Sequence, residues 1–183
     1  MIDFAPLPRL ETERLILRGW QESDIAPYVA MNADPEVMRF FEAPLSRDDT
    51  EKAIVWYQNG IRSTGFGRHA VELKATGEFI GMTGLMVVDF DCAFTGALEA
   101  GWRIARPHWR QGYAKEAAAE VVRWGLEDKG LDAIIAFAST HNRPSIGVMQ
   151  SIGMVRDENG DFVHPGIPAG HELQPMEAWW ARR

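Results

Sequence analysis

Four basic side chains lie close together in a chain whose formal net charge is −7. They are Arg103, Arg106, Arg110 and Lys115. The first acidic residue after them is Glu116, and Gly112 precedes an alanine-rich segment with helical spacing. Free backbone N–H groups at a helix N-terminus bind phosphate, and a glycine lets an anion approach the main chain. This stretch therefore predicts an anion site where a strand passes into a helix.

Other chemistry-bearing patterns are weak. The signature GxxxxGK[ST] and a complete GxGxxG are absent, and "TGFGRHA" at 64–70 holds only Gly65 and Gly67. Nucleoside triphosphate chemistry is therefore disfavoured. The five histidines show no spacing such as HExxH, so no metal site is predicted.

Length and composition restrict the class of protein. With 183 residues, 46% hydrophobic and 25% charged, the chain suits one globular domain over residues 1–183. Its acidic balance argues against a nucleic-acid partner and weakly favours a cationic one. A single cysteine forms no internal disulfide, and no apolar run is long enough for a membrane span. We therefore expect a cytoplasmic protein without a membrane partner, as a monomer or a homodimer.

The anion site would be positioned by strands and helices that follow one another along the chain. Apolar spacing and helix-capping residues predict strands at 14–20, 68–74, 79–89, 96–106, 133–140, 154–165 and 173–183, and helices at 22–34, 46–61, 113–129 and 142–153. The second helix is expected to end near Gly60, and the third is expected to stop at Gly130. This order predicts a mixed sheet with helices packed on it, an α+β fold.

Several of these segments together resemble a known family. "WRQGYAKEA" resembles the acyl-CoA pyrophosphate loop of the GNAT superfamily of N-acetyltransferases, and "NRPSIGVMQSIGM" resembles the block that follows it. "LETERLILRGW", "TGEFIGMTGL" and "HPGIPAGHEL" extend the resemblance over nearly the whole chain. The branch with ribosomal-protein alanine and serine N-acetyltransferases is the most similar. It often carries an aromatic residue where Trp109 stands, in place of the superfamily's Gln or Arg.

The resemblance implies a mostly antiparallel, twisted sheet with about four helices and a splay between its fourth and fifth strands, at 99–104 and 133–140. Acetyl-CoA would be the co-substrate, and no metal would be needed. The pantetheine arm would pair with the strand at Trp102, Arg103 and Ile104. The diphosphate would lie on the main chain of Arg110, Gln111, Gly112, Tyr113 and Ala114. Asn142 and Ser145 would contact the pantetheine arm and the sulfur.

Catalytic roles follow from the same resemblance, with alternatives. A backbone N–H between Trp102 and Ile104 would donate to the thioester carbonyl. Glu99 is the candidate base, directly or through water, but a carboxylate here can equally be the ion-pair partner of an arginine such as Arg103. Glu72 is the second choice. Ser145 is a candidate acid toward the leaving thiolate, although serine and asparagine at a helix start are also ordinary caps.

Three functions remain open at this stage. The first is acetyl-CoA-dependent N-acetylation of a primary amine, either a protein or peptide N-terminus or a small molecule such as a metabolite or antibiotic. The second is a non-catalytic acyl-CoA-binding module. The third is an enzyme of phosphorylated sugars or nucleotides that uses the same loop. In the family that the chain resembles, acceptor contacts come from the first two helices and the last hairpin.

Overall fold

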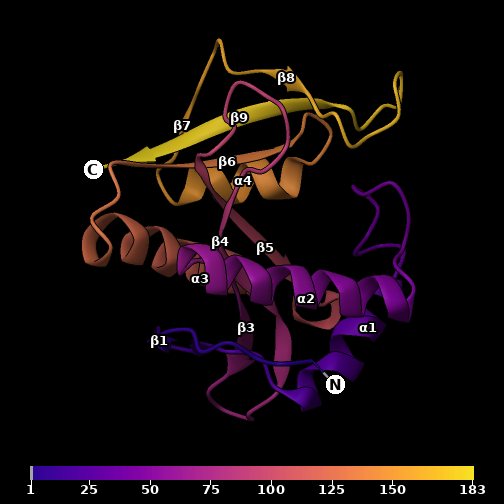
Figure 1. The fold of residues 1–183 in the computed structure, drawn as a ribbon, viewed down its shortest axis with the longest axis vertical. Helices are drawn as coiled ribbons and strands as arrows, with labels where there is room; N and C mark the ends of the chain where they lie inside the picture. Colours follow the sequence, from indigo (N-terminus) through magenta and orange to yellow (C-terminus); the bar gives the residue numbers. More distant parts are fainter. Residues whose placement is uncertain (1) are drawn as a thin grey trace.

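A twisted sheet runs through the structure, a computed structural model that describes residues 2–183 and places nine strands in that range (Figure 1). The strands are β1 (Leu10–Glu11), β2 (Leu15–Arg18), β3 (Arg68–Leu73), β4 (Phe79–Val87), β5 (Leu98–Ile104), β6 (Ala133–Ser139), β7 (Val155–Arg156), β8 (Phe162–Val163) and β9 (Pro175–Arg182). They follow the order β1-β2-β3-β4-β5-β6-β9-β7, and β8 also pairs with β9. Only β5 and β6 are paired in parallel within residues 2–183, so the predicted mostly antiparallel sheet is confirmed.

Four α-helices cover the two faces of this sheet within the described range. They are α1 (Ile25–Ala33), α2 (Arg47–Thr64), α3 (Tyr113–Arg123) and α4 (Arg143–Ser151). One apolar cluster joins α3 and α4 to residues such as Val71, Leu85 and Ala100. A second cluster joins α1 and α2 to Ala70 and Met82 on the other face. Neighbouring residues such as Ala70 and Val71 therefore face different pairs of helices, as the pleat requires.

Helix α2 begins as its sequence predicts and ends later. The Ser46 side chain accepts a hydrogen bond from the Asp49 N–H, which caps the first turn. The predicted end near Gly60 is wrong, because the helix continues to Thr64 and Gly65 closes it with φ 78°. Gly60 serves packing instead: a Cβ there would lie 2.9 Å from Met86 Cε. The missing side chain lets α2 approach β4.

Helix α3 also differs from its predicted extent. It is α-helical from Tyr113 to Arg123 and then widens into a π-helical turn over Trp124–Asp128. Within that turn a Cβ on Gly125 would lie 2.8 Å from Leu85 Cδ1, so the glycine permits close contact with the sheet. Gly130, at φ 70°, ends the segment as predicted.

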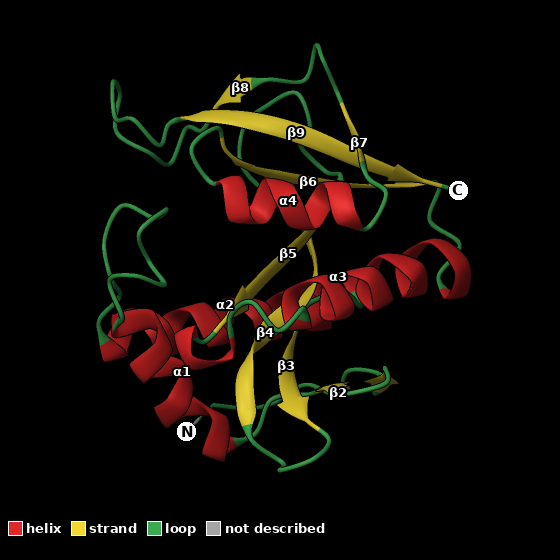
Figure 2. Cartoon of the chain, turned by 180° about the vertical axis from the view of Figure 1, so that it is seen from behind, coloured by secondary structure: helices red, strands yellow, loops and turns green. Residues whose placement is uncertain are grey.

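Strands β5 and β6 separate soon after they meet. Their register holds a single pair, Glu99 with Ile135, whereas β4 and β5 are paired from Gly81 and Ile104 to Val87 and Leu98. Figure 2 shows β5 running obliquely away from β6. The splay expected between the strands at 99–104 and 133–140 is therefore present. It opens beside the strand that leads to the basic loop.

The structure differs from the prediction at two short segments. At the sheet edge, β1 pairs with β2 and was not predicted, and the segment expected as one strand at 154–165 holds two short strands, β7 and β8. Both β7 and β8 pair with β9, which Figure 1 shows as the long yellow arrow. Strands of two residues have too few positions for a period-two pattern to indicate them. Among residues 2–183 no helix is long and apolar enough to cross a membrane.

Candidate active site

The hydrogen-bond alternation of β5 decides which of its amides face the splay. The Ala105 N–H donates to the Ile80 carbonyl at 2.8 Å, and the Val88 N–H donates to the Ala97 carbonyl at 2.9 Å. In an antiparallel ladder, hydrogen-bonded and non-hydrogen-bonded positions alternate. Odd-numbered residues of β5 therefore bond to β4, and even-numbered residues direct their N–H and C=O groups away from β4.

Trp102 and Ile104 are the even-numbered residues beside the gap. Their N–H groups point toward the separated β6, whereas Arg103 is paired with Met82 of β4. The Ile104 carbonyl accepts a hydrogen bond from Trp109 Nε1 at 2.6 Å. Trp109 thus joins the end of β5 to the basic loop through its side chain. Of the three strand residues that the sequence suggested, the main-chain geometry favours Trp102 and Ile104 over Arg103.

The basic loop presents a row of free donors. Within residues 2–183, none of the N–H groups of 110–115 donates to a protein acceptor, and the first main-chain bond of α3 runs from Glu116 N–H to the Gly112 carbonyl. Arg110 at φ 61° and Gly112 at φ 83° adopt the left-handed conformation, which turns successive N–H groups toward one side. Such a concavity at a helix N-terminus fits a diphosphate.

A brace from the N-terminal hairpin holds this loop, and sequence reasoning did not identify it. Arg14 Nη1 donates to the Gln111 carbonyl at 2.9 Å, and its Nε donates to Glu116 Oε2 at 2.7 Å. Thr12 Oγ1 donates to Glu116 Oε1 at 2.5 Å. Burial raises the pKa of Glu116, but these hydrogen bonds and the Arg14 charge outweigh it and leave that pKa below its ordinary value.

Asn142 and Ser145 lie at the start of α4, where a cap and a ligand contact are the two roles expected for them. Asn142 Oδ1 accepts a hydrogen bond from the Ser145 N–H at 3.2 Å, so Asn142 is the N-cap of the helix. The Ser145 hydroxyl makes no hydrogen bond within the described range 2–183 and is half-buried. Capping uses the Asn142 oxygen and leaves its amide N–H₂ and the Ser145 hydroxyl available to a ligand.

Glu99 is held by an arginine, but not by the one that the sequence suggested. Its Oε2 accepts from Arg68 Nη2, and the Arg68 guanidinium also donates to the main-chain carbonyls of Gly84 and Glu99. A Cβ at Gly101 would lie 2.6 Å from Arg68 Nη2, so this glycine makes room for the guanidinium. The expected pairing with Arg103 is absent. Glu99 Oε1 has no protein donor among residues 2–183 and can receive a proton.

Glu72, the second choice for a base, belongs to another ion-pair cluster. Arg18 Nε donates to Glu72 Oε2 at 2.7 Å, while its two terminal nitrogens bind Asp24 at 2.7 and 2.9 Å. The hydrogen bond with Asp24, reinforced by Glu72, raises the pKa of Arg18. Glu72 uses one carboxylate oxygen in this pair, as Glu99 does, but it lies on β3, two strands from β5 and the splay, which favours Glu99 as the base.

His164 lies near Glu99 and was considered in the sequence only as a metal ligand. Its ring centroid is 4.6 Å from that of Phe90, and its Nδ1 accepts from the Gly166 N–H at 3.1 Å. Burial lowers the pKa of His164, and the charge of Glu99 opposes that shift. The loop between β8 and β9 therefore holds an imidazole whose Nδ1 is an acceptor and whose Nε2 carries the proton when the ring is neutral, on the side of the sheet where the charge of Glu99 acts on it. Its place in "HPGIPAGHEL" was the only sequence signal.

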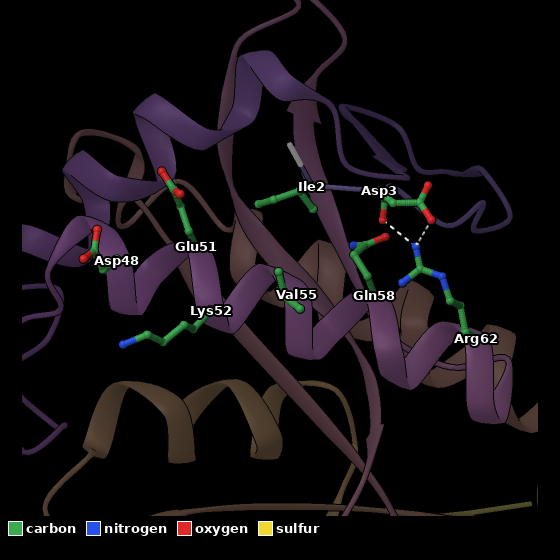
Figure 3. A pocket seen from close by; sticks show the side chains of 8 residues that line it. All are labelled: Ile2, Asp3, Asp48, Glu51, Lys52, Val55, Gln58 and Arg62. Carbon is green, nitrogen blue, oxygen red and sulfur yellow. Dashed lines mark hydrogen bonds and ion pairs between the residues drawn. The ribbon is translucent and has the colours of Figure 1, made fainter.

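A broad groove lies away from the splay. It has a volume of about 640 Å³ and is lined by Ile2, Asp3, Asp48, Glu51, Lys52, Val55, Gln58 and Arg62 (Figure 3). Asp3 pairs with Arg62 at 2.7 Å, and Gln58 Oε1 accepts from the Ala5 N–H at 2.7 Å. The groove therefore marks where the N-terminal segment lies along α2. No cluster of three or more His, Cys, Asp or Glu side chains among residues 2–183 is placed to hold a metal ion.

Comparison with known proteins decides the family. Residues 14–155 match the model of the acetyltransferase (GNAT) domain. The chain belongs to the GNAT family of acetyltransferases. Acetyltransferases of this family act with acetyl-CoA.

Individual relatives agree with this assignment. The FsC-acetyl coenzyme A-N(2)-transacetylase of Aspergillus fumigatus is 34% identical over 174 residues, covering 89% of this chain and 73% of that protein. The crystal structure of an acetyltransferase from Agrobacterium tumefaciens has a TM-score of 0.78 at 26% identity, covering 97% and 95% of the two chains. A putative ribosomal-protein-serine acetyltransferase from Vibrio cholerae shares the fold, with a TM-score of 0.76 at 18% identity and coverage of 96% and 98%. The protein is an N-acetyltransferase of the GNAT fold.

Proposed function

We propose that residues 1–183 form a single N-acetyltransferase domain that moves the acetyl group of acetyl-CoA directly to a primary amine. A protein or peptide N-terminus is the first candidate acceptor, and a small-molecule amine is the second. The proposal rests on two sets of free N–H groups that follow each other along the chain. One set belongs to Trp102 and Ile104 at the splay, and the other to residues 110–115 at the start of α3.

The main chain would do most of the binding. The N–H groups of Arg110, Gln111, Gly112, Tyr113 and Ala114 would hold the diphosphate, and those of Trp102 and Ile104 would pair with the pantetheine arm. Asn142 and Ser145 would contact the arm near the sulfur. Because Trp109 bonds to the end of β5, its side chain would set the distance between the two groups of donors rather than contact phosphate.

The chemistry needs one bond made and one broken. The amine nitrogen forms a bond to the thioester carbon, the carbon–sulfur bond breaks, the amine loses a proton and the thiolate gains one. The N–H of Trp102 would donate to the carbonyl oxygen as it becomes negative, a contribution of about 3 to 4 kcal/mol. Glu99 Oε1 would take the amine proton directly or through water, and the Ser145 hydroxyl would donate to the departing thiolate.

An N-terminal α-amine suits this arrangement. Its pKa of about 7.7 to 8.0 leaves roughly a tenth of the amine neutral at pH 7, so the demand on a base is small. A lysine-like amine, with a pKa of about 10.4, would leave under about 0.1% neutral. The name of the Aspergillus relative also describes transfer to an N(2) position of its own substrate.

The proposal is tested by acetyl transfer onto peptides of varied N-termini, polyamines and aminoglycosides, read by mass spectrometry. We expect acetylated product and release of the CoA thiol with one class of amine. Thermal unfolding in the presence of CoA, ATP or NAD checks the co-substrate separately, since the true ligand raises the transition temperature. CoA binding without thiol release by any amine would favour a non-catalytic acyl-CoA-binding module.

A further inference from the structure

We propose that Arg103 is a specificity-determining residue that binds a carboxylate carried by the amine acceptor. The inference rests on the proposed function, because it concerns the acceptor of the same reaction. It reverses the expectation from the overall charge of −7, which favoured a cationic acceptor.

The side chain of Arg103 lies on the sheet face that carries α1 and α2. Its Nη1 donates to Asn32 Oδ1 at 2.6 Å, and its guanidinium carbon lies 4.2 Å from the centre of the Phe41 ring. Asn32 is fully buried and is itself bonded to Thr50 Oγ1 at 3.3 Å. The guanidinium is thus held in one orientation before any acceptor arrives.

The charge of this guanidinium is not balanced. Arg103 forms no ion pair within residues 2–183, and its Nε is buried without a hydrogen-bond partner. Nearby, Glu99 already neutralises Arg68, and the exposed Glu42 beside Phe41 makes no ion pair with Arg103. A half-buried cation with few partners is costly unless an anion joins it. Arginine binds carboxylates in a bidentate geometry, so a carboxylate is the matching group.

The location of Arg103 connects it to the acceptor. Glu99, Gly101 and Arg103 are alternate residues of β5 and share one face of the strand. Successive positions on that face are about 6 to 7 Å apart. An amine beside Glu99 and Gly101 would therefore lie within a few ångströms of a group that Arg103 binds. A second cation on the acceptor would meet Arg103 and be repelled.

The experiment compares amines that differ only in a carboxylate. Ornithine and putrescine form one pair, and a short peptide with aspartate at its second position and its asparagine counterpart form the other. The kcat/KM of each probe is measured for the wild type, for Arg103→Gln and for Arg39→Gln. Arg39 is the matched control, because it stacks on Phe40 at 4.4 Å in the same loop but is half-exposed.

We expect the wild type to prefer the carboxylate-bearing member of a pair. Arg103→Gln should lower the kcat/KM of the carboxylate-bearing member about ten- to a hundredfold, mainly through KM. The kcat/KM of the member without a carboxylate should stay unchanged or improve. Arg39→Gln should keep the wild-type preference. The pair that responds distinguishes a free amino acid from a peptide side chain as the source of the carboxylate.

Equal loss for both members of each pair would show that Arg103 only braces the loop, and would overturn the inference. No preference in the wild type would overturn it as well. If no probe is acetylated, the wider panel of amines decides the proposed function separately. Thermal stabilisation of the CoA-saturated wild type by ornithine relative to putrescine then still decides the inference, and equal stabilisation contradicts it.

Discussion

The ion pair with Arg68 uses one oxygen of Glu99 and leaves the other without a donor from residues 2–183. A structural and a chemical role are therefore compatible in this one residue. The side chain is one-sixth exposed, at 17%, so solvent or an acceptor amine can reach it. The arginine fixes the direction of the carboxylate, which is the requirement for a base that must meet a proton at hydrogen-bond distance.

Replacing Glu99 with glutamine separates these roles. Glutamine keeps a carbonyl oxygen for Arg68 but removes the proton acceptor. We expect kcat to fall by roughly ten- to a hundredfold for a lysine-like amine and by less for an α-amine, with little change in CoA affinity. Glu72→Gln is the control, since Glu72 is bonded to Arg18. Full activity of Glu99→Gln across the pH range would contradict the assignment.

Gly112 tests the diphosphate site. Gly112→Glu would add a negative charge beside the free N–H groups, and its Cβ would lie 3.3 Å from Arg14 Nη2. CoA affinity, measured by calorimetry, should fall on the order of tenfold or more. Gly65→Glu is matched in backbone strain, with φ 78° against 83°, but lies at the end of α2. Unchanged CoA binding by Gly112→Glu would place the diphosphate elsewhere.

At the scale of elements, helix α3 is joined to the β1–β2 hairpin by three groups that meet on Glu116: the Thr12 hydroxyl, the Arg14 N–H and the Arg14 guanidinium. The same guanidinium reaches the Gln111 carbonyl of the basic loop. The edge of the sheet thus determines how the first turn of α3 is presented.

We expect Glu116→Gln to weaken this connection. At pH 7 the free energy of unfolding should fall by about 1 kcal/mol, and CoA affinity should fall a few-fold. Because the folded pKa lies below the ordinary 4.5, the carboxylate stabilises the fold above that value and loses its effect as pH falls through the folded pKa. Urea unfolding should therefore show a larger difference between variant and wild type at pH 7 than at pH 3.

Glu120→Gln is the control for that measurement. Glu120 lies on the same helix and pairs with Arg123 at 2.8 Å within it. Its removal should leave CoA affinity unchanged, because no group of the hairpin depends on it. Equal losses of CoA affinity in the two variants would show that the hairpin does not position the loop.

At the scale of the whole molecule, His69 connects the N-terminal segment to the core. It is fully buried, its Nε2 lies 3.1 Å from the Pro8 carbonyl, and its ring meets Trp124 edge to face at 5.9 Å. Burial lowers the pKa of His69 to about 4, so the side chain is neutral in the folded protein. An unfolded chain would bind the proton near the ordinary 6.5.

This difference makes the stability of the fold depend on pH. Since the folded pKa is the lower one, the unfolded state binds more protons between the two values, and stability falls as pH drops from 6.5 toward 4. From pH 7 to pH 5 the wild type should lose roughly 2 kcal/mol from this residue. His69→Gln, although less stable at pH 7, should lose correspondingly less in urea unfolding. An unchanged slope with pH would contradict a neutral, buried His69.

The sequence by itself determined the features that depend on neighbouring residues. Capping residues and left-handed glycines mark helix ends, and the free donors before Glu116 follow from a helix start after Gly112. Apolar periodicity and the family resemblance determined the order of elements and the splay. The error at Gly60 arose because a glycine that permits packing looks, in sequence, like one that ends a helix. The π-helical turn over Trp124–Asp128 was missed because apolar spacing does not distinguish it from an α-helix.

Only the tertiary structure decided which side chains meet across the sheet. Glu99 is paired with Arg68, 31 residues away, rather than with Arg103. Arg103 is paired with Asn32 at a separation of 71 residues, and Arg14 with Glu116 at a separation of 102. Strand register and helix placement set these partners, and both depend on burial of the whole core. A local pattern can name a charged residue, but its partner is chosen by the packing of segments far apart in the chain.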